Sequence, residues 1–276
     1  MPKIITEDMI EQAAIKALHE RHNYIILNCM TEEPDTLPDG TGRKDKKQVV
    51  LPDVMFESLC RINPDIPTET VRIVVDELCR TPVSGDLMLT NYQNYQKIRN
   101  GITVEYNKNG KKTSNILRLL SYNDALSNTF TVASQMWIKG ETHWRRPDLI
   151  IFINGFPMVF IELKNSNIPV KNAYDINLKN YLKDIPYLFN YNQICVLSNG
   201  METRLGSFAA GYEFFFEWLK VENEKENPDR KAIRENCTSL EYFIAGLCEP
   251  RNLLDYIENF ILYDRRRTKI IAKNHQ

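Results

Sequence analysis

Two carboxylates and a lysine lie in one apolar stretch of this chain, "RRPDLIIFINGFPMVFIELK", at residues 145–164. The stretch predicts two strands joined by a turn. Residues two apart in a strand share a face, so Glu162 and Lys164 project together, while Asp148 comes from the preceding strand. Two carboxylates in apolar surroundings repel each other and lose hydration, and a divalent cation relieves both effects. Ligation by oxygen atoms alone suits Mg²⁺.

The strand register decides whether Asp148 can join Glu162. A two-residue turn at Asn154 and Gly155 would set Asp148 opposite Ile161, on the wrong face. A three-residue loop, or a bulge, would set it opposite Glu162 instead. If the site forms, we therefore expect an odd-length loop near Asn154 and Gly155, or a bulge with the same effect, rather than a simple two-residue hairpin.

With that register, Asp148 and Glu162 would hold the metal, and the backbone carbonyl of Leu163 would be a third ligand. Lys164 could then orient or deprotonate a water molecule, or stabilise a developing negative charge. Such a site suits the attack of water on a phosphodiester. The alternative is a structural ion pair between Lys164 and one of the two acids on a half-exposed strand.

The surrounding elements predict an α/β fold. A helix should follow Thr6, and residues 24–27 and 129–138 should be strands. Residues 30–48 predict an exposed loop. Residues 49–100 should be mainly helical, with breaks near 63–64 and 81–82, and a hairpin should turn at 109–110. A helix is expected over 170–189, which Pro186 ends or bends. Strands at 193–200 and 203–208 and helices at 239–248 and 251–262 should follow. A mixed central sheet flanked by helices, with a helical insertion before the catalytic strands, accommodates this order.

Composition sets limits on function. The 276 residues carry a net charge of −1, so nucleic-acid binding would need a local basic patch. The six cysteines form no C-x-x-C pair, and the four histidines complete no zinc pattern, which is typical of free thiols in a reducing cytoplasm. The N-terminus has no apolar signal core, and no run approaches transmembrane length. We expect a cytoplasmic protein with no membrane partner.

The ordered motifs resemble a known family. "RPD", "NG-P" and "IELK" are similar to the PD-(D/E)XK nuclease superfamily, and more closely to the N-terminal endonuclease domain of the R (HsdR) subunit of type I restriction enzymes. Pro147 and Asp148 match the first catalytic motif, and Glu162 to Lys164 match the second. "NLKNYLKDIPYLFNYNQICVLSNGMETRLGSF" resembles the segment of that family that carries a Q-x-x-x-Y motif. The resemblance covers most of residues 1–275 and is strongest over 129–208.

The resemblance implies a restriction-endonuclease-like PD-(D/E)XK core over residues 1–260, with 49–100 as a helical insertion. Residues 261–276 would be a basic linker toward an ATP-dependent translocase that this chain lacks, because it contains no G-x-x-x-x-G-K-[ST] motif. It implies Mg²⁺-dependent hydrolysis of double-stranded DNA, with ATP used only by the missing motor. The implied partners are the modification (M) and specificity (S) subunits. A domain that only binds DNA or couples subunits, and a stand-alone repair or junction nuclease, remain alternatives.

Five further residues are candidates for supporting roles or DNA binding: Asn177, Tyr181, Glu11, Arg145 and Arg146. Asn177 replaces the glutamine of the Q-x-x-x-Y motif, and Tyr181 is its tyrosine; packing of the helix on the sheet is the alternative for both. In related nucleases a glutamate like Glu11 approaches the metal, although Glu7 competes for that role and either could be a solvated helix acid. Arg145 and Arg146 could contact phosphate or form surface ion pairs.

Overall fold

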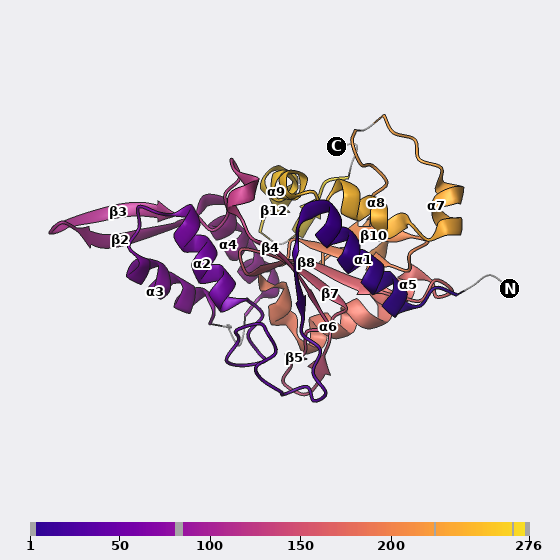
Figure 1. Cartoon of the computed structure of the whole chain (residues 1–276), viewed down its shortest axis with the longest axis horizontal. Helices are drawn as coiled ribbons and strands as arrows, with labels where there is room; N and C mark the ends of the chain where they lie inside the picture. The colour runs from indigo at the N-terminus through magenta and orange to yellow at the C-terminus, as the bar shows by residue number, and fades with distance from the viewer. Residues whose placement is uncertain (1–3, 81–84, 224, 267, 274–276) are drawn as a thin grey trace.

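A seven-stranded mixed sheet forms the centre of the computed structural model, which describes residues 4–80, 85–223, 225–266 and 268–273 (Figure 1). The strand order is β1-β4-β7-β8-β9-β10-β11. Strand β1 runs parallel to β4, and β8 runs parallel to β9, whereas the other neighbours are antiparallel. The strands are β1 (Ile25–Asn28), β4 (Phe130–Ser134), β7 (Leu149–Ile153), β8 (Phe156–Leu163), β9 (Ile194–Ser198), β10 (Thr203–Gly206) and β11 (Phe216–Glu217).

The middle of the sheet is buried on both faces. Every residue of β4, β7, β8 and β9 is buried, as expected for continuous runs of β-branched and aromatic residues. Helices pack on both sides, and residues from strands and helices together form the two apolar clusters of the core. The helices are α1 (Glu7–His22), α2 (Pro52–Ile62), α3 (Thr68–Leu78), α4 (Leu87–Asn100), α5 (Val170–Asn172), α6 (Lys179–Asp184), α7 (Arg230–Asn236), α8 (Ser239–Gly246) and α9 (Pro250–Asn259).

Short elements complete the fold. A π-helical turn, η2 (Ala173–Leu178), joins α5 to α6, and three 3₁₀ turns are η1 (Ala125–Ser127), η3 (Pro186–Asn190) and η4 (Tyr212–Phe214). Three two-stranded sheets lie outside the central one: β2 (Ile102–Lys108) with β3 (Lys111–Leu117), β5 (Ile138–Lys139) with β6 (Trp144–Arg145), and β12 (Ile261–Asp264) with β13 (Thr268–Ile271). The β2–β3 hairpin extends away from the rest of the fold (Figure 1).

Several local predictions are confirmed. Thr6 caps α1, accepting a hydrogen bond from the Met9 backbone N–H at 3.3 Å. The helical insertion consists of α2, α3 and α4, with the expected break after Ile62. The β2–β3 hairpin turns at Asn109 and Gly110, both in the left-handed region. The second expected break, at 81–82, lies outside the described residues.

Three local predictions need correction. Residues 30–48 do not form a wholly exposed loop, because Asp39 is buried in ion pairs with Arg43 and Lys46. The strand expected over 129–138 ends at Ser134, since Gln135 turns into the left-handed region with φ of 55°. The helix expected over 170–189 is divided by the π-helical turn, although it does end before Pro186 as predicted.

The stretch expected to be a basic linker, residues 261–276, contains a hairpin that packs into the fold. Ile261 and Ile271 belong to the core. Lys269 is 2% exposed, and its ammonium donates to the Asn192 carbonyl at 2.6 Å and to Gln193 Oε1 at 3.0 Å. These contacts attach the β12–β13 hairpin to the segment that directly precedes β9, an interior strand of the central sheet.

Candidate active site

A bulge in β8 sets the register of the β7–β8 hairpin. The turn itself has two residues, because Ile153 pairs with Phe156 across Asn154 and Gly155, whose φ angles of 50° and 82° are both left-handed. The odd-length loop favoured by the sequence is therefore wrong. The alternative, a bulge, is what the structure shows.

The pairing shifts between two steps of the ladder: Phe152 pairs with Pro157, whereas Ile151 pairs with Val159. Met158 is the extra residue, and its carbonyl accepts from the Gln193 backbone N–H at 2.7 Å, on the side of β9. From this point the ladder continues to Leu149 and Ile161. Asp148, one step further, lies level with Glu162, as the predicted site requires.

Asp148 bridges β7 and β8 at the ends of the strands farthest from the turn. Its Oδ2 accepts a hydrogen bond from the backbone N–H of Leu163 at 2.7 Å, which fixes the carboxylate against β8. Partial burial raises the pKa of Asp148 above its ordinary value, although this hydrogen bond and the positive charge of Lys164 oppose the rise. The group is thus held in place but poorly solvated.

Glu162 is the most deeply buried acid of the site, at 2% exposure. Its Oε1 accepts from the Lys164 ammonium at 3.1 Å. Among the described residues no hydrogen-bond partner reaches its buried Oε2. Burial first, and then the charge of Asp148, raise the pKa of Glu162 to about 8. A buried oxygen without a partner is costly and requires an explanation.

Lys164 lies directly after β8 and occupies the space between the predicted ligands. Its ammonium donates to Glu162 and, in a close contact, to the carbonyl of Leu163, and it lies 3.7 Å from a carboxylate oxygen of Glu7. Two of the three atoms that sequence reasoning assigned to a metal are therefore engaged by a positive charge. The Glu162 Oε1 and the Leu163 carbonyl oxygen thus already bind one cation, the Lys164 ammonium.

The donor set fits a hard divalent cation. Asp148 and Glu162 supply carboxylate oxygens from adjacent strands, and the Leu163 carbonyl directly follows Glu162 in the chain. The unpartnered Oε2 of Glu162 and the raised pKa values of both acids indicate that a cation would relieve their desolvation. In the described ranges no group of three or more His, Cys, Asp and Glu side chains is placed to hold a metal.

Helix α1 brings two more acids to this region. Glu11 is 5% exposed, and its Oε2 accepts a close hydrogen bond from the side-chain amide of Gln135. Burial raises the pKa of Glu11, and the negative charge of Asp148 adds to the rise. Glu7 forms the ion pair with Lys164 instead. Both acids thus approach the site from one helix, and neither is a purely solvated helix acid.

The two arginines before Asp148 have different partners. Arg145 forms an ion pair with Asp184 at the end of α6, donating through Nε at 2.7 Å and through Nη2 in a close contact. The guanidinium of Arg146 lies 4.9 Å from the ring centroid of Trp137, a cation–π arrangement. Arg145 therefore connects β6 to α6, whereas the planar face of Arg146 rests on an indole.

Tyr181 reaches the site and Asn177 does not. The Tyr181 ring packs edge-on against Phe160, with centroids 5.3 Å apart, and its hydroxyl donates to the Arg146 carbonyl at 3.1 Å. Burial, and then the charge of Glu162, raise the pKa of Tyr181 well above its ordinary value. Asn177 is half-buried on the π-helical turn, and its side chain makes no hydrogen bond to any other described residue.

Gln135 is the residue that sequence reasoning missed. It contacts Glu11, which is 124 positions away in the chain, and no local motif marks that pair. The bulge, in contrast, had a local signal. Pro157 cannot donate to a strand ladder, and proline inside a central strand is found mainly at bulges.

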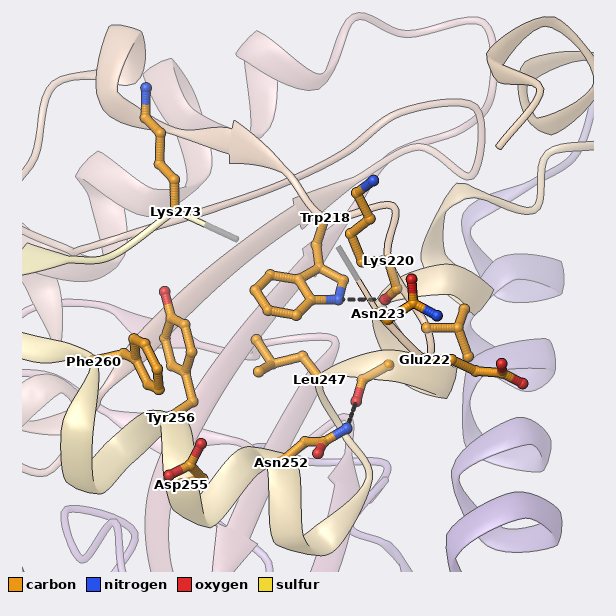
Figure 2. Close-up of a pocket in the computed structure, with 12 residues that line it drawn as sticks. Trp218, Lys220, Glu222, Asn223, Leu247, Asn252, Asp255, Tyr256, Phe260 and Lys273 are labelled. Atoms are coloured by element: carbon orange, nitrogen blue, oxygen red, sulfur yellow. Dashed lines mark hydrogen bonds between the residues drawn. The ribbon is translucent and has the colours of Figure 1, made fainter. Parts of the chain in front are cut away.

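A separate cavity lies away from these residues, beside α8 and α9 (Figure 2). It has a volume of about 210 Å³, and Trp218, Leu247, Tyr256 and Phe260 supply its apolar lining. The indole N–H donates to the Lys220 carbonyl at 2.7 Å, which fixes the loop above the cavity. None of the acids described above lines it, so the candidate chemistry lies in the β7–β8 hairpin.

Comparison with known proteins agrees with this geometry. The family described as "Type I restriction enzyme R protein N terminus" matches residues 4–214. The chain belongs to this family. The match includes the whole of the β7–β8 hairpin, helix α1 and the segment that carries Tyr181. The mixed sheet flanked by helices is consistent with a PD-(D/E)XK-like nuclease domain, as the sequence predicted.

Named relatives of this R protein N-terminal family are similar along the chain. The "Type I restriction enzyme HindI endonuclease subunit" of Haemophilus influenzae is 34% identical over 99% of this chain and 26% of its own length. The "Putative type I restriction enzyme MjaIXP endonuclease subunit" of Methanocaldococcus jannaschii is 29% identical over 99% of this chain and 27% of its own length. The chain spans about a quarter of the length of these relatives. No helix in the described part of the chain is long and apolar enough to cross a membrane.

Proposed function

We propose that this chain is the endonuclease domain of a type I restriction enzyme R subunit and hydrolyses phosphodiester bonds in double-stranded DNA with Mg²⁺. The observation that carries the proposal is the meeting of Asp148 and Glu162 across the bulged hairpin, with one buried Glu162 oxygen unpartnered and Lys164 beside it. The names of the relatives, which are endonuclease subunits, support the same reaction class.

Each residue has a role that follows from its contacts. Asp148, Glu162 and the Leu163 carbonyl would hold the cation, which when bound would polarise the phosphodiester and make water a better nucleophile. Lys164 now donates to two of these oxygens. With a cation held there, the Lys164 ammonium would be free to stabilise the negative charge that develops on the attacked phosphate.

Neighbouring side chains maintain this arrangement. Tyr181 holds the backbone at Arg146, two residues before Asp148, and thereby fixes the start of β7. Arg146, resting on Trp137, is the basic side chain that we assign to a DNA phosphate. Arg145 is less suited to that role because Asp184 already binds its guanidinium on two sides. In the full-length protein we expect the M and S subunits as partners and ATP use by a motor outside this chain.

The decisive experiment compares two lysine variants in the full-length complex. Lys164→Ala should abolish DNA cleavage while ATP hydrolysis persists, because the substitution removes a group from the hairpin and leaves a distant motor unchanged. Lys179→Ala is the matched control, since Lys179 is exposed on α6 and pairs with Asp175 instead. Cleavage retained in Lys164→Ala would refute the catalytic assignment.

A second candidate is a nuclease-like domain that only binds DNA or couples subunits. The observation in its favour is Asn177, which replaces the glutamine of the Q-x-x-x-Y motif and makes no hydrogen bond to the described acids. Titration of Mg²⁺ into the chain, followed by a cleavage assay on linear duplex DNA, separates the two. Metal binding at Asp148 with no cleavage under any condition, in the chain or in the full-length complex, would favour the second candidate.

A further inference from the structure

Gln135 has a backbone conformation that glutamine rarely adopts. It directly follows β4, and its φ of 55° lies in the left-handed region, which is unfavourable for residues other than glycine and, to a lesser extent, asparagine and aspartate. Its backbone N–H donates to the carbonyl of Asp148 at 3.0 Å, which extends the β4–β7 ladder by one step. The strained residue is therefore built into the same strand end that presents Asp148.

The side chain of Gln135 explains why glycine is not the residue at this position. Its amide donates to Oε2 of the buried Glu11 in a close contact, while its backbone N–H binds the Asp148 carbonyl. One residue thus connects two acids that come from different elements, α1 and the start of β7. Together the two contacts hold Glu11 at the strand end that carries Asp148.

We propose that Gln135 is a positioning residue, which holds the Glu11 carboxylate at the strand end that presents Asp148 and so supports cation binding by Asp148 and Glu162. The inference rests on the proposed metal-dependent function and adds to it a residue that acts through Glu11 rather than on the substrate. Strained backbone tends to persist where the surrounding structure gains from the side chain it carries. Here the gain is a donor held against the buried Glu11 carboxylate.

Cation binding by the isolated chain tests this role without depending on cleavage. Mn²⁺ is the probe, titrated by calorimetry at pH 8, with circular dichroism to confirm folding. Gln135→Met keeps the length of the side chain and removes the amide, and Gln135→Gly removes the side chain while suiting the left-handed backbone. Both should lower Mn²⁺ affinity by about tenfold, the lower end of the effect of losing a group that orients metal ligands.

Non-additivity with Glu11 separates positioning from a general structural effect. If Gln135 acts through Glu11, the double variant Glu11→Gln/Gln135→Met should bind Mn²⁺ no more weakly than Glu11→Gln alone. Fully additive losses, or wild-type affinity in both Gln135→Met and Gln135→Gly, would overturn the proposal.

A further variant distinguishes failure of this inference from failure of the proposed function. Asp148→Asn should abolish Mn²⁺ binding if the metal site is real. Loss in Asp148→Asn together with wild-type binding in both Gln135 variants would overturn the positioning role alone. Equal Mn²⁺ binding in wild type and Asp148→Asn, or none in wild type, would overturn both.

Discussion

Neutralising Glu162 should remove a loss of folding stability that the metal-free protein undergoes as pH rises. Burial raises the pKa of Glu162 from 4.5 to about 8 in the folded chain, so the folded state binds this proton more tightly than the unfolded state. The stability linked to Glu162 is therefore fully present below pH 4.5 and is lost as pH rises toward 8. Each tenfold change in proton affinity is about 1.36 kcal/mol, so the full effect is on the order of 5 kcal/mol.

The variant Glu162→Gln stays neutral at every pH and should not show this loss. Urea unfolding in EDTA, repeated from pH 5 to pH 9, gives the free energy of unfolding of both proteins. Between pH 5 and pH 9, we expect the unfolding free energy of the variant to increase by several kcal/mol relative to that of the wild type. Asp148 and Glu11, whose pKa values are also raised, are present in both proteins, so the comparison isolates Glu162.

Magnesium should reverse the effect in the wild type only. A ligand present at a hundred times its Kd stabilises the folded state by about 2.7 kcal/mol, and Mg²⁺ should do so at pH 8.5 much more than at pH 6. Glu20→Gln, at an exposed position of α1, is the control for loss of an acid. A difference between wild type and Glu162→Gln that stays constant from pH 5 to pH 9 would refute the reasoning about burial.

Three further perturbations test the supporting structure. Gly155→Ala should lower the free energy of unfolding by at least about 2 kcal/mol, because φ is 82° and the new Cβ would lie 2.6 Å from the Leu51 carbonyl oxygen. In the control Gly110→Ala, the new Cβ meets no described atom within 4 Å. An equal loss of melting temperature in both variants would argue against the clash. Arg145→Ala should cost about 2 to 3 kcal/mol in urea unfolding, because it leaves the buried Asp184 carboxylate without its main partner; unchanged stability would contradict this. Burial lowers the pKa of Lys269 to about 7, so the unfolded chain binds this proton more tightly than the folded chain. The free energy of unfolding of the wild type should therefore rise from pH 7 to pH 10, and Lys269→Met should flatten that rise. An identical pH dependence of the unfolding free energy in both proteins would show that Lys269 is not its source.

The order of the elements could be predicted from the sequence because its signals are local. The Thr6 cap, the break after Ile62 and the Asn109–Gly110 turn each depend on a few neighbouring residues. The same holds for the two acids and the lysine of the hairpin, whose shared face follows from strand periodicity. What remained open was the register, and the overlooked signal was Pro157, which lies inside a strand that has neighbours on both sides.

Contacts between distant segments could not be predicted in this way. Asp39 lies in a charged stretch that favours an exposed loop, yet it is buried because Arg43 and Lys46 fold back onto it. Arg145 pairs with Asp184, 39 positions later, and Gln135 pairs with Glu11 from the first helix. Such partners become neighbours only through the tertiary fold, so residue type and spacing alone leave them open.

The bulge at Met158 has a consequence for how the two acids may be spaced in sequence. It absorbs one residue near the turn, and beyond it the ladder pairs Ile151 with Val159 as a regular antiparallel hairpin would. A hairpin one residue shorter, without the bulge, would bring the same two carboxylates level. The interval between Asp148 and Glu162 can therefore drift by single insertions or deletions on the turn side while the chemistry is unchanged. Searches for distant relatives should fix the strand ends and leave the length of the hairpin free.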